Sequence, residues 1–187
     1  MTVERARRAD ARRNAQAVID AARTLFAEQG VDVPMEQIGK AAGIGKGTLY
    51  RHFPTRDHLF AAVSRDRFNR LTAAAESLNS DLDDPLAALC EWLQDFDRSA
   101  QHYRGMRVVV SVGIADDGSA IFASCQAMTE RADALLHRAK EAGQVRPEID
   151  IRPLLSTVAA LPERFRDADG ASELLPVIIR GICTNPR

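Results

Sequence analysis

The sequence predicts an all-α protein, in which three N-terminal helices are followed by a longer series of helices. Apolar residues recur at intervals of three and four through most of the chain, which places them on one face of a helix. Glycines, prolines and aspartates interrupt this pattern at positions typical of helix ends. We place the domain boundary between residues 54 and 55, so that the domains span 1–54 and 55–187.

The first helix is predicted over residues 12–29. Gly30 ends it, because glycine readily adopts the left-handed conformation that closes a helix. The apolar stripe of this helix consists of Ala15, Val18, Ile19, Ala22, Leu25 and Phe26.

Two short helices joined by a glycine turn are predicted over residues 34–53. The first begins at Pro34, whose fixed φ and missing N–H suit a first helical turn. The second ends before Pro54, since the residue before a proline avoids helical angles. Two such helices form a helix-turn-helix. The buried stripe of the first is Met35, Ile38 and Ala42, and the turn is Gly43, Ile44 and Gly45.

Two longer helices follow. One begins at Thr55, a good N-cap, and carries Leu59, Phe60, Val63 and Phe68. After a loop over residues 80–84, Asp84 before Pro85 is a strong start signal for the next. That helix carries Leu86, Leu89, Cys90, Leu93 and Phe96.

Four further helices complete the prediction. The first covers residues 106–114; its valine run has strand propensity, but we expect a buried helix because no partner strand is evident. The second follows residues 116–119. After a turn at 143–147, Asp150 caps the third and Pro162 ends it, and the last starts around Ser172. The second has the stripe Ile121, Cys125, Met128, Ala132, Leu135 and Ala139.

Charge is distributed unevenly along the chain. The whole chain has a net charge of −1. Residues 1–70 hold 13 Lys and Arg against 8 Asp and Glu, whereas residues 71–187 hold 12 against 18. The first part is therefore basic, at +5, which suits nucleic acid because each neutralised phosphate releases a counterion. A solvated charged tail is the alternative interpretation.

The composition favours a cytoplasmic protein without a membrane segment. Apolar residues make up 45% of the chain, yet no apolar run approaches the roughly 18 residues of a membrane span. The arginine-rich start is not followed by the apolar core of a secretion signal. The odd number of cysteines, Cys90, Cys125 and Cys183, indicates buried thiols rather than a disulfide framework or zinc site, with redox sensing as the alternative.

The second helix of the motif presents a polar face suited to DNA. Leu49 and Phe53, four residues apart, point inward with Ile44. Arginine can bridge guanine O6 and N7, threonine can meet a thymine methyl, and lysine, tyrosine and histidine suit phosphates. Taken alone, this pattern also fits an ordinary polar helix face. The side chains and backbone left for a DNA groove are those of Lys46, Gly47, Thr48, Tyr50, Arg51 and His52.

Residues 12–60 resemble the DNA-binding domain of the TetR (tetracycline repressor) family of bacterial regulators. The matching stretches are VIDAARTLFAEQG at 18–30, Ile38, AGI at 42–44, GTLYRHF at 47–53 and RDHL at 56–59. They are spread in order over about fifty positions, which makes the match specific. The C-terminal two-thirds matches only in layout and in the turn at 143–147.

The resemblance implies a ligand-responsive regulator, most simply a repressor. The family's fold is three DNA-binding helices followed by a larger domain that binds a small molecule and dimerises. The implied partners are a palindromic double-stranded operator, a second copy of the chain and a small hydrophobic or amphipathic effector; no cofactor or metal is implied. The family's DNA-contacting positions fall on Lys46, Gly47, Thr48, Tyr50, His52 and Arg56.

Two positions depart from the family pattern. Gly45 stands where a serine commonly caps the recognition helix, a change that costs only a few tenths of a kcal/mol. Val33 and Pro34 replace a threonine-rich start of the preceding helix, which puts one phosphate contact in doubt.

The resemblance also places an effector cavity and a dimer interface in the second domain. Aromatic and methionine stripes are more often plain core, and this alternative stays open. We expect the last two helices to expose apolar stripes that pair across a two-fold axis: Leu154, Leu155, Val158, Leu174, Leu175, Ile178 and Ile182. The expected lining of the effector cavity is Trp92, Phe96, Met106, Val110, Cys125 and Met128.

The first residues form an arginine-rich arm. Deletion of residues 1–8 should weaken DNA binding if the arm lies along the DNA backbone or reaches a minor groove. A disordered tail without a role is the alternative. The arginines concerned are Arg5, Arg7, Arg8, Arg12 and Arg13.

Two other functional classes fit the sequence less well. The four histidines form no metalloprotease motif, and neither a phosphate-binding glycine loop nor a nucleophile elbow is present, so an enzyme is disfavoured. A helical carrier protein that has lost DNA binding is disfavoured by Tyr50, His52 and the basic arm.

Overall fold

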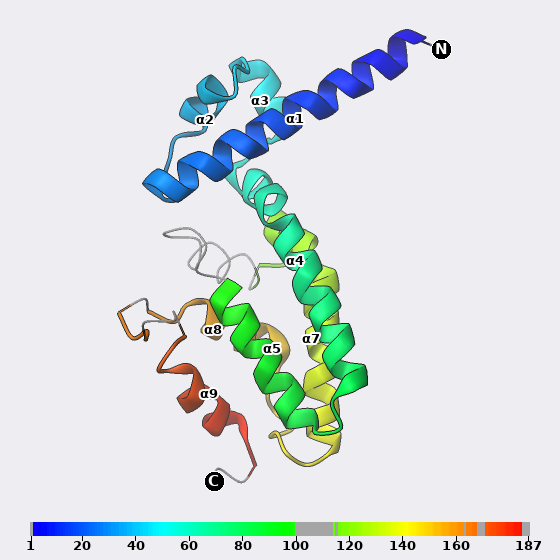
Figure 1. The fold of residues 1–187 in the computed structure, drawn as a ribbon, viewed down its shortest axis with the longest axis vertical. Coiled ribbons are helices and arrows are strands. Elements are labelled where there is room, and N and C mark those ends of the chain that lie inside the picture. Colours follow the sequence, from blue (N-terminus) through cyan, green and yellow to red (C-terminus); the bar gives the residue numbers. More distant parts are fainter. Residues whose placement is uncertain (1, 100–113, 115, 163, 168–170, 185–187) are drawn as a thin grey trace.

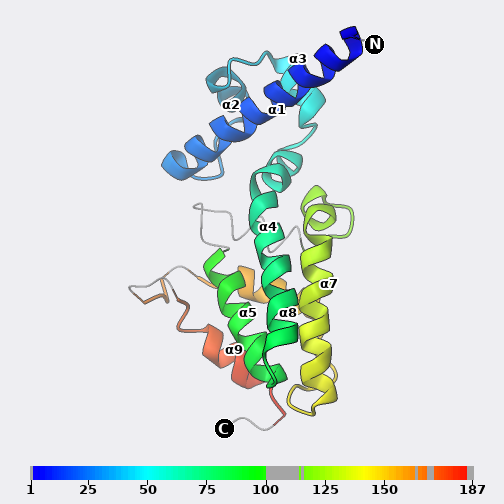
Figure 2. The same ribbon diagram turned by 45° about the vertical axis from the view of Figure 1, so that its right-hand side comes forward.

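The computed structural model describes residues 2–99, 114, 116–162, 164–167 and 171–184. Within these residues the chain forms eight α-helices and no β-strand, which confirms the predicted all-α class. The molecule is elongated, with the N-terminus beside the helix-turn-helix and the C-terminus at the opposite end (Figures 1 and 2). The predicted helix over residues 106–114 lies outside the described residues except for Ile114, which is buried.

α1 (Thr2–Gln29) begins well before the predicted start at residue 12. Alanine and arginine dominate the added turns, and both have high helix propensity. Those turns lack an apolar stripe, so the apolar pattern could not predict them. Gly30 ends the helix as predicted, with a φ of 86°.

The helix-turn-helix is confirmed as α2 (Met35–Ala41) and α3 (Lys46–His52). Pro34 is the N-cap of α2 rather than its first helical residue. Gly43, with a φ of 69°, makes the turn between the two helices. Both helices pack against α1, and the packed side chains include Val18, Phe26, Ile38 and Leu49, each 0% exposed.

α4 (Arg56–Asp81) leads from the helix-turn-helix into the second domain (Figure 2). Its start at Thr55 is confirmed, because the Thr55 hydroxyl accepts a hydrogen bond from the backbone N–H of His58. α4 contacts α1 near its start and α5 (Pro85–Ser99) and α7 (Ala120–Glu141) further along. Trp92 on α5 donates its indole N–H to the carbonyl of Leu71 on α4 at 2.8 Å, which joins the two helices.

α8 (Ile151–Ala159) and α9 (Leu175–Ile182) complete the second domain. Asp150 lies at the N-cap of α8 as predicted, but its side chain makes no capping hydrogen bond. α9 begins at Leu175, three residues after the predicted start, with Pro176 in its first turn.

The expectation that α8 and α9 expose apolar stripes is wrong for most of these side chains. They pack into the core of their own protomer, because α8 lies against α5 and α7. Only Leu174 and Ile178 are partly buried rather than buried. The buried ones are Leu154, Leu155, Val158, Leu175 and Ile182.

The cysteines are buried or half-buried, as the sequence analysis expects. Cys125 is buried and Cys90 and Cys183 are half-buried, all as free thiols. Burial raises the pKa of Cys90 to about 11 and also raises that of Cys125, so both thiols stay protonated near neutral pH. Among the described helices, none has the length and apolar character to cross a membrane.

Candidate DNA interface

α3 presents its polar side chains on the face opposite the core. Leu49 is 0% exposed and Phe53, just after the helix, is 6% exposed, as the four-residue spacing predicts. Gly45 caps the helix through its carbonyl, which accepts hydrogen bonds from the N–H groups of Thr48 and Leu49 at 3.0 Å. Lys46, Gly47 and Arg51 are exposed, and Thr48, Tyr50 and His52 are half-buried.

A close approach between the two helices of the motif depends on a glycine that sequence reasoning missed. A Cβ added at Gly39 on α2 would lie 3.1 Å from Leu49 Cδ2 and 3.2 Å from the Ile44 carbonyl oxygen. Gly47 on α3 is the opposite case, since a Cβ there would meet nothing within 4 Å. Gly39 therefore allows α2 and α3 to pack closely, and Gly47 keeps the backbone of α3 accessible.

Glu36 on α2 joins two of the predicted DNA-contacting side chains. Its carboxylate lies 3.2 Å from Lys46 Nζ and accepts a hydrogen bond from the Tyr50 hydroxyl at 3.1 Å. The Lys46 ammonium also lies 5.9 Å from the centre of the Tyr50 ring. Sequence reasoning did not include Glu36, because only the crossing of α2 and α3 brings it to this surface.

This cluster shifts two pKa values. A hydrogen bond from its own backbone, followed by those from Lys46 and Tyr50, lowers the pKa of Glu36. The hydrogen bond to Glu36 is the main cause that raises the pKa of Tyr50. Near neutral pH, Glu36 therefore carries a negative charge beside Lys46 and Tyr50, on the surface proposed to meet phosphates.

Arg56, at the start of α4, is tied to the motif. Its Nη1 donates to the carbonyl of Val31, in the loop between α1 and α2, at 2.5 Å. The guanidinium thus braces the helix-turn-helix, and its charge also acts on Tyr50 of α3. A phosphate contact by Arg56 stays a prediction.

The predicted effector residues are densely packed where the structure describes them. Trp92 and Phe96 on α5 stack with their ring centres 5.5 Å apart. Together with Cys125 and Met128 on α7 they are at most 2% exposed. Met106 and Val110 lie outside the described residues.

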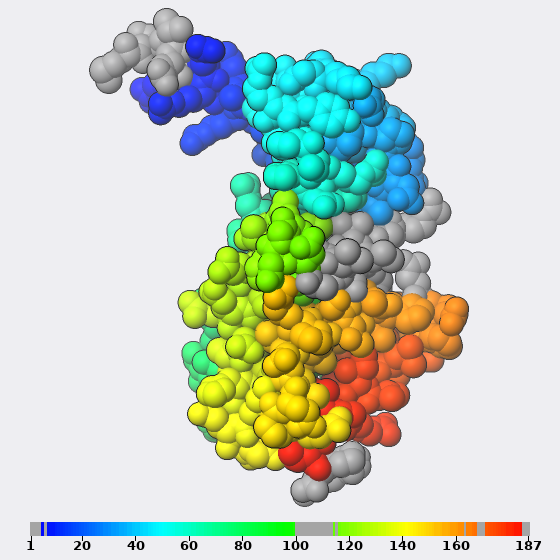
Figure 3. Space-filling model, turned by 180° about the vertical axis from the view of Figure 1, so that it is seen from behind, coloured from blue at the N-terminus to red at the C-terminus, as the bar shows by residue number. Residues whose placement is uncertain are grey.

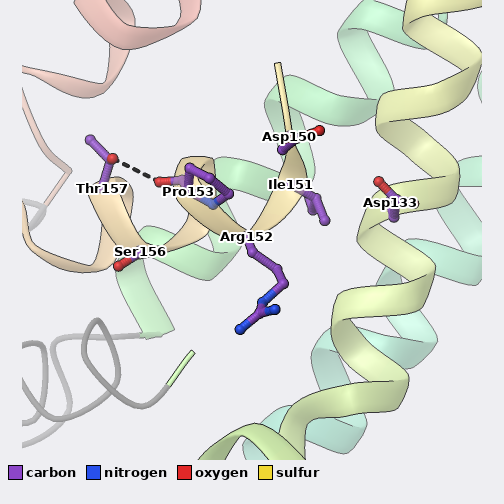
Figure 4. Close-up of a pocket in the computed structure, with 7 residues that line it drawn as sticks. All are labelled: Asp133, Asp150, Ile151, Arg152, Pro153, Ser156 and Thr157. Atoms are coloured by element: carbon purple, nitrogen blue, oxygen red, sulfur yellow. Dashed lines mark hydrogen bonds between the residues drawn. The ribbon is translucent and has the colours of Figure 1, made fainter. Parts of the chain in front are cut away.

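Three of the hollows that the described residues outline are lined by other side chains. The largest, about 700 Å³, lies between α7 and α8, with Asp133 on one side and Arg152 on the other (Figure 4). Smaller ones of about 420 Å³ and 200 Å³ adjoin α5, facing α4 and α9 respectively. An effector site among the four packed residues stays a prediction.

Two family models match the chain. The one described as "Bacterial regulatory proteins, tetR family" matches residues 18–63. The one described as "Transcriptional regulator SbtR-like, C-terminal domain" matches residues 84–184, more than half of the chain. The second match extends the similarity into the region where the sequence showed only a common layout.

Individual relatives agree with the family models. A helix-turn-helix transcriptional regulator of Staphylococcus aureus (strain USA300) is 44% identical over 61 residues, covering 32% of this chain and 33% of that protein. The match thus spans about a third of the length of such curated relatives.

Solved structures of other proteins are similar to this chain over most of its length. The TetR transcriptional regulator SCO0520 from Streptomyces coelicolor is 30% identical with a TM-score of 0.54, covering 90% of this chain and 98% of that one. RolR, crystallised with resorcinol, is 26% identical with a TM-score of 0.64, and the match covers 92% of this chain and 89% of that one. Proteins of this type are DNA-binding regulators and not enzymes. With its helix-turn-helix and its C-terminal domain both matched, the chain belongs to the TetR family of bacterial transcriptional regulators.

Proposed function

We propose that the protein is a ligand-responsive repressor that binds a palindromic operator as a homodimer. A small hydrophobic or amphipathic effector releases it from DNA. The observation that carries the proposal is the surface of α3, where Lys46, Gly47 and Arg51 are exposed while Leu49 is buried. We keep the domain boundary between residues 54 and 55, where Thr55 caps the connecting helix α4.

The side chains of α3 have distinct proposed roles. Arg51 contacts a guanine edge, because a guanidinium can donate two hydrogen bonds to O6 and N7. Thr48 contacts a base edge or a thymine methyl, and the exposed backbone at Gly47 allows DNA to approach α3 closely. The residues assigned to phosphates are Lys46, Tyr50, His52 and Arg56.

The dimer and the effector complete the proposal. Two recognition helices related by a two-fold axis would lie about one DNA turn apart, roughly 34 to 36 Å, which calls for a palindromic operator. RolR was crystallised with resorcinol, a small aromatic diol, and this supports a small effector here. The effector lowers DNA affinity only as far as it prefers the state that cannot bind.

The test begins by selecting duplexes from a random pool with the full-length protein. A repressor of this type should enrich a palindrome and bind it less tightly at higher salt. Tyr50→Ala and His52→Ala should weaken binding without loss of folding. Arg51→Ala should relax preference at one position by about 1 to 3 kcal/mol.

A control variant comes from the far domain. Arg131→Ala on α7 breaks only an exposed ion pair with Glu76, so it should leave DNA affinity unchanged. A carrier protein that has lost DNA binding would enrich no sequence, and unchanged affinity in all three α3 variants would contradict the site.

A further inference from the structure

The hollow of about 420 Å³ between α4 and α5 gathers positive charge. Arg67 and Arg70 line it from α4, and Arg98 lines it from the last turn of α5. The carboxylate of Asp95 also lines it. Three guanidinium groups against one carboxylate give these charged side chains a net charge of +2. We call this hollow the arginine hollow.

The arginine hollow lies between two helices that are joined to each other. Residues 82–84 are the whole connection between α4 and α5, so the two helices run side by side in opposite directions (Figures 1 and 2). The hydrogen bond from Trp92 to the Leu71 carbonyl, 2.8 Å long, ties them together at the level of the hollow. Seen from behind, the surface of the second domain is formed mostly by α7, α8 and α9 (Figure 3), whereas α4 and α5 lie on the side seen in Figure 1.

Helical spacing turns the lining residues of each helix toward the hollow. On both helices they follow intervals of three and four, which place them on one helical face. Arg70 is exposed, and its guanidinium has no hydrogen bond or ion pair with any described residue. Arg98 Nη2 donates to Asp95 Oδ1 at 2.5 Å, which holds the Arg98 guanidinium at the hollow. Arg70 therefore has donors to offer to a ligand.

A hydroxyl at the same hollow also lacks a partner. Ser99 lines the hollow, and its Oγ is buried without a hydrogen-bond partner among the described residues. A buried hydroxyl without a partner is destabilising. An acceptor oxygen bound in the hollow would satisfy it.

The charge and the donors favour a phosphate over a carboxylate. A phosphate monoester carries about −1.5 to −2 charges near pH 7 and has three strong acceptor oxygens, which matches the net charge of the lining. A single carboxylate carries only one charge. Guanidinium groups bind phosphate oxygens in pairs, with two parallel hydrogen bonds. Leu71 and Ala74 add an apolar wall for the organic part of the ligand.

We propose that the arginine hollow binds the phosphate group of a small organic phosphate monoester. The site is separate from the effector cavity expected around Trp92, Phe96, Cys125 and Met128. It goes beyond the proposed function, because nothing in it depends on DNA binding by α3.

The test is isothermal titration calorimetry of the full-length protein with phenyl phosphate at low ionic strength, where exposed charges are least screened. The wild type should bind this probe saturably. Benzoate has the same ring but one charge, and inorganic phosphate lacks the ring, so both should bind at least several-fold more weakly. Benzoate bound as tightly would overturn the preference for phosphate, inorganic phosphate bound as tightly would overturn the ester, and no saturable binding would overturn the site.

Three variants locate the site. Arg70→Gln should weaken phenyl phosphate binding about tenfold, because it removes a charge-assisted hydrogen bond. Asp95→Asn should tighten binding, because it removes a negative charge from the hollow. Arg65→Gln is the matched control: it removes an exposed arginine roughly 140° around α4 from Arg70 and should keep the wild-type affinity. Glutamine has nearly the helix propensity of arginine, so α4 stays intact in both arginine variants. Equal affinities in these two variants would overturn the proposal.

The phosphate site and the proposed function fail separately. The titration contains no DNA, so loss of phenyl phosphate binding in Arg70→Gln alone would support the site even if selection enriched no palindrome. If Arg70→Gln instead weakened binding to a random duplex and bound phenyl phosphate as the wild type does, the hollow would belong to the DNA-binding surface and the proposal would be wrong.

Discussion

Glu36 is the acidic side chain that pairs with the recognition surface in the absence of DNA. It pairs with Lys46 and Tyr50, so both have a protein partner that a phosphate must replace. Its side chain is 54% exposed, and its contacts are with α3 rather than the core. Removing its charge therefore tests DNA binding without a large change in folding.

We predict that Glu36→Gln binds random duplex more tightly and with a steeper salt dependence. Lys46 would be freed to neutralise a phosphate, which steepens the slope by about 0.9. Fluorescence anisotropy at several salt concentrations measures both quantities. Glu173→Gln removes an exposed carboxylate in the far domain and serves as the control. Tighter binding in both variants would point to net charge alone.

Two glycines of the motif should respond to alanine in opposite ways. Gly39→Ala places a methyl 3.2 Å from the Ile44 carbonyl oxygen, which cannot move cheaply, so we expect a loss of about 1 to 3 kcal/mol in unfolding free energy. Gly47→Ala meets open space within a helix and should gain about 0.5 to 1 kcal/mol. Urea unfolding measures both. Equal effects would mean that the approach of α2 to α3 does not depend on Gly39.

Among the elements, a buried ion pair joins α5 to the segment that follows α8. Asp97 accepts two hydrogen bonds from Arg166, each 2.8 Å long. The side chains of Asp97 and Arg166 are 1% and 7% exposed, so the pair is shielded from water. The pair thereby fixes residues 164–167 against α5.

We predict that Asp97→Ala lowers the free energy of unfolding by about 3 to 5 kcal/mol, because it leaves a buried arginine without its carboxylate. Asp97→Leu with Arg166→Met should recover much of that loss. Asp95→Ala, which breaks an exposed pair with Arg98, should cost less than about 1 kcal/mol. If the two alanine variants unfold at the same urea concentration, the buried pair does not stabilise the contact between α5 and residues 164–167.

Helix ends were predictable from sequence where one residue decides them. Gly30 ends α1 and Thr55 caps α4 by local backbone chemistry, and both predictions are confirmed. The start of α1 was not predictable from apolar spacing, since its first turns lack an apolar stripe. For the DNA surface, the inward direction of Leu49 followed from spacing. The place of Glu36 beside Lys46 depends on a tertiary crossing that no local pattern encodes.

At the scale of the whole molecule, one continuous core runs from the helix-turn-helix to the C-terminal helices. α4 contributes to this core near both of its ends. The ring centres of Phe60 and of Phe26 on α1 lie 4.9 Å apart, and the Leu71 carbonyl accepts the hydrogen bond from Trp92. We propose that a shift of α5 or α7 against α4 is passed to the helix-turn-helix, and that an effector changes DNA affinity by this route.

The interface of the proposed dimer has to use side chains that the protomer does not bury. Leu155 is 0% exposed, so Leu155→Glu would disrupt the core instead of testing association. Val177 on α9 is 62% exposed and has the most exposed large apolar side chain of the described residues. It lies on the same short helix as Leu175 and Ile182, which anchor α9 to the core. The outer face of α9 is accordingly the better candidate for the two-fold contact.

We predict that Val177→Glu separates the proposed dimer while leaving each protomer folded. Two carboxylates brought together without partners across an apolar contact would outweigh the contact itself. Sedimentation equilibrium should show a monomer, and affinity for the selected palindrome should fall because the two half-sites would then be bound independently. Val177→Leu keeps the apolar surface and should remain a dimer with wild-type affinity. A Val177→Glu protein that still sediments as a dimer and binds the palindrome as tightly as before would place the interface on another surface.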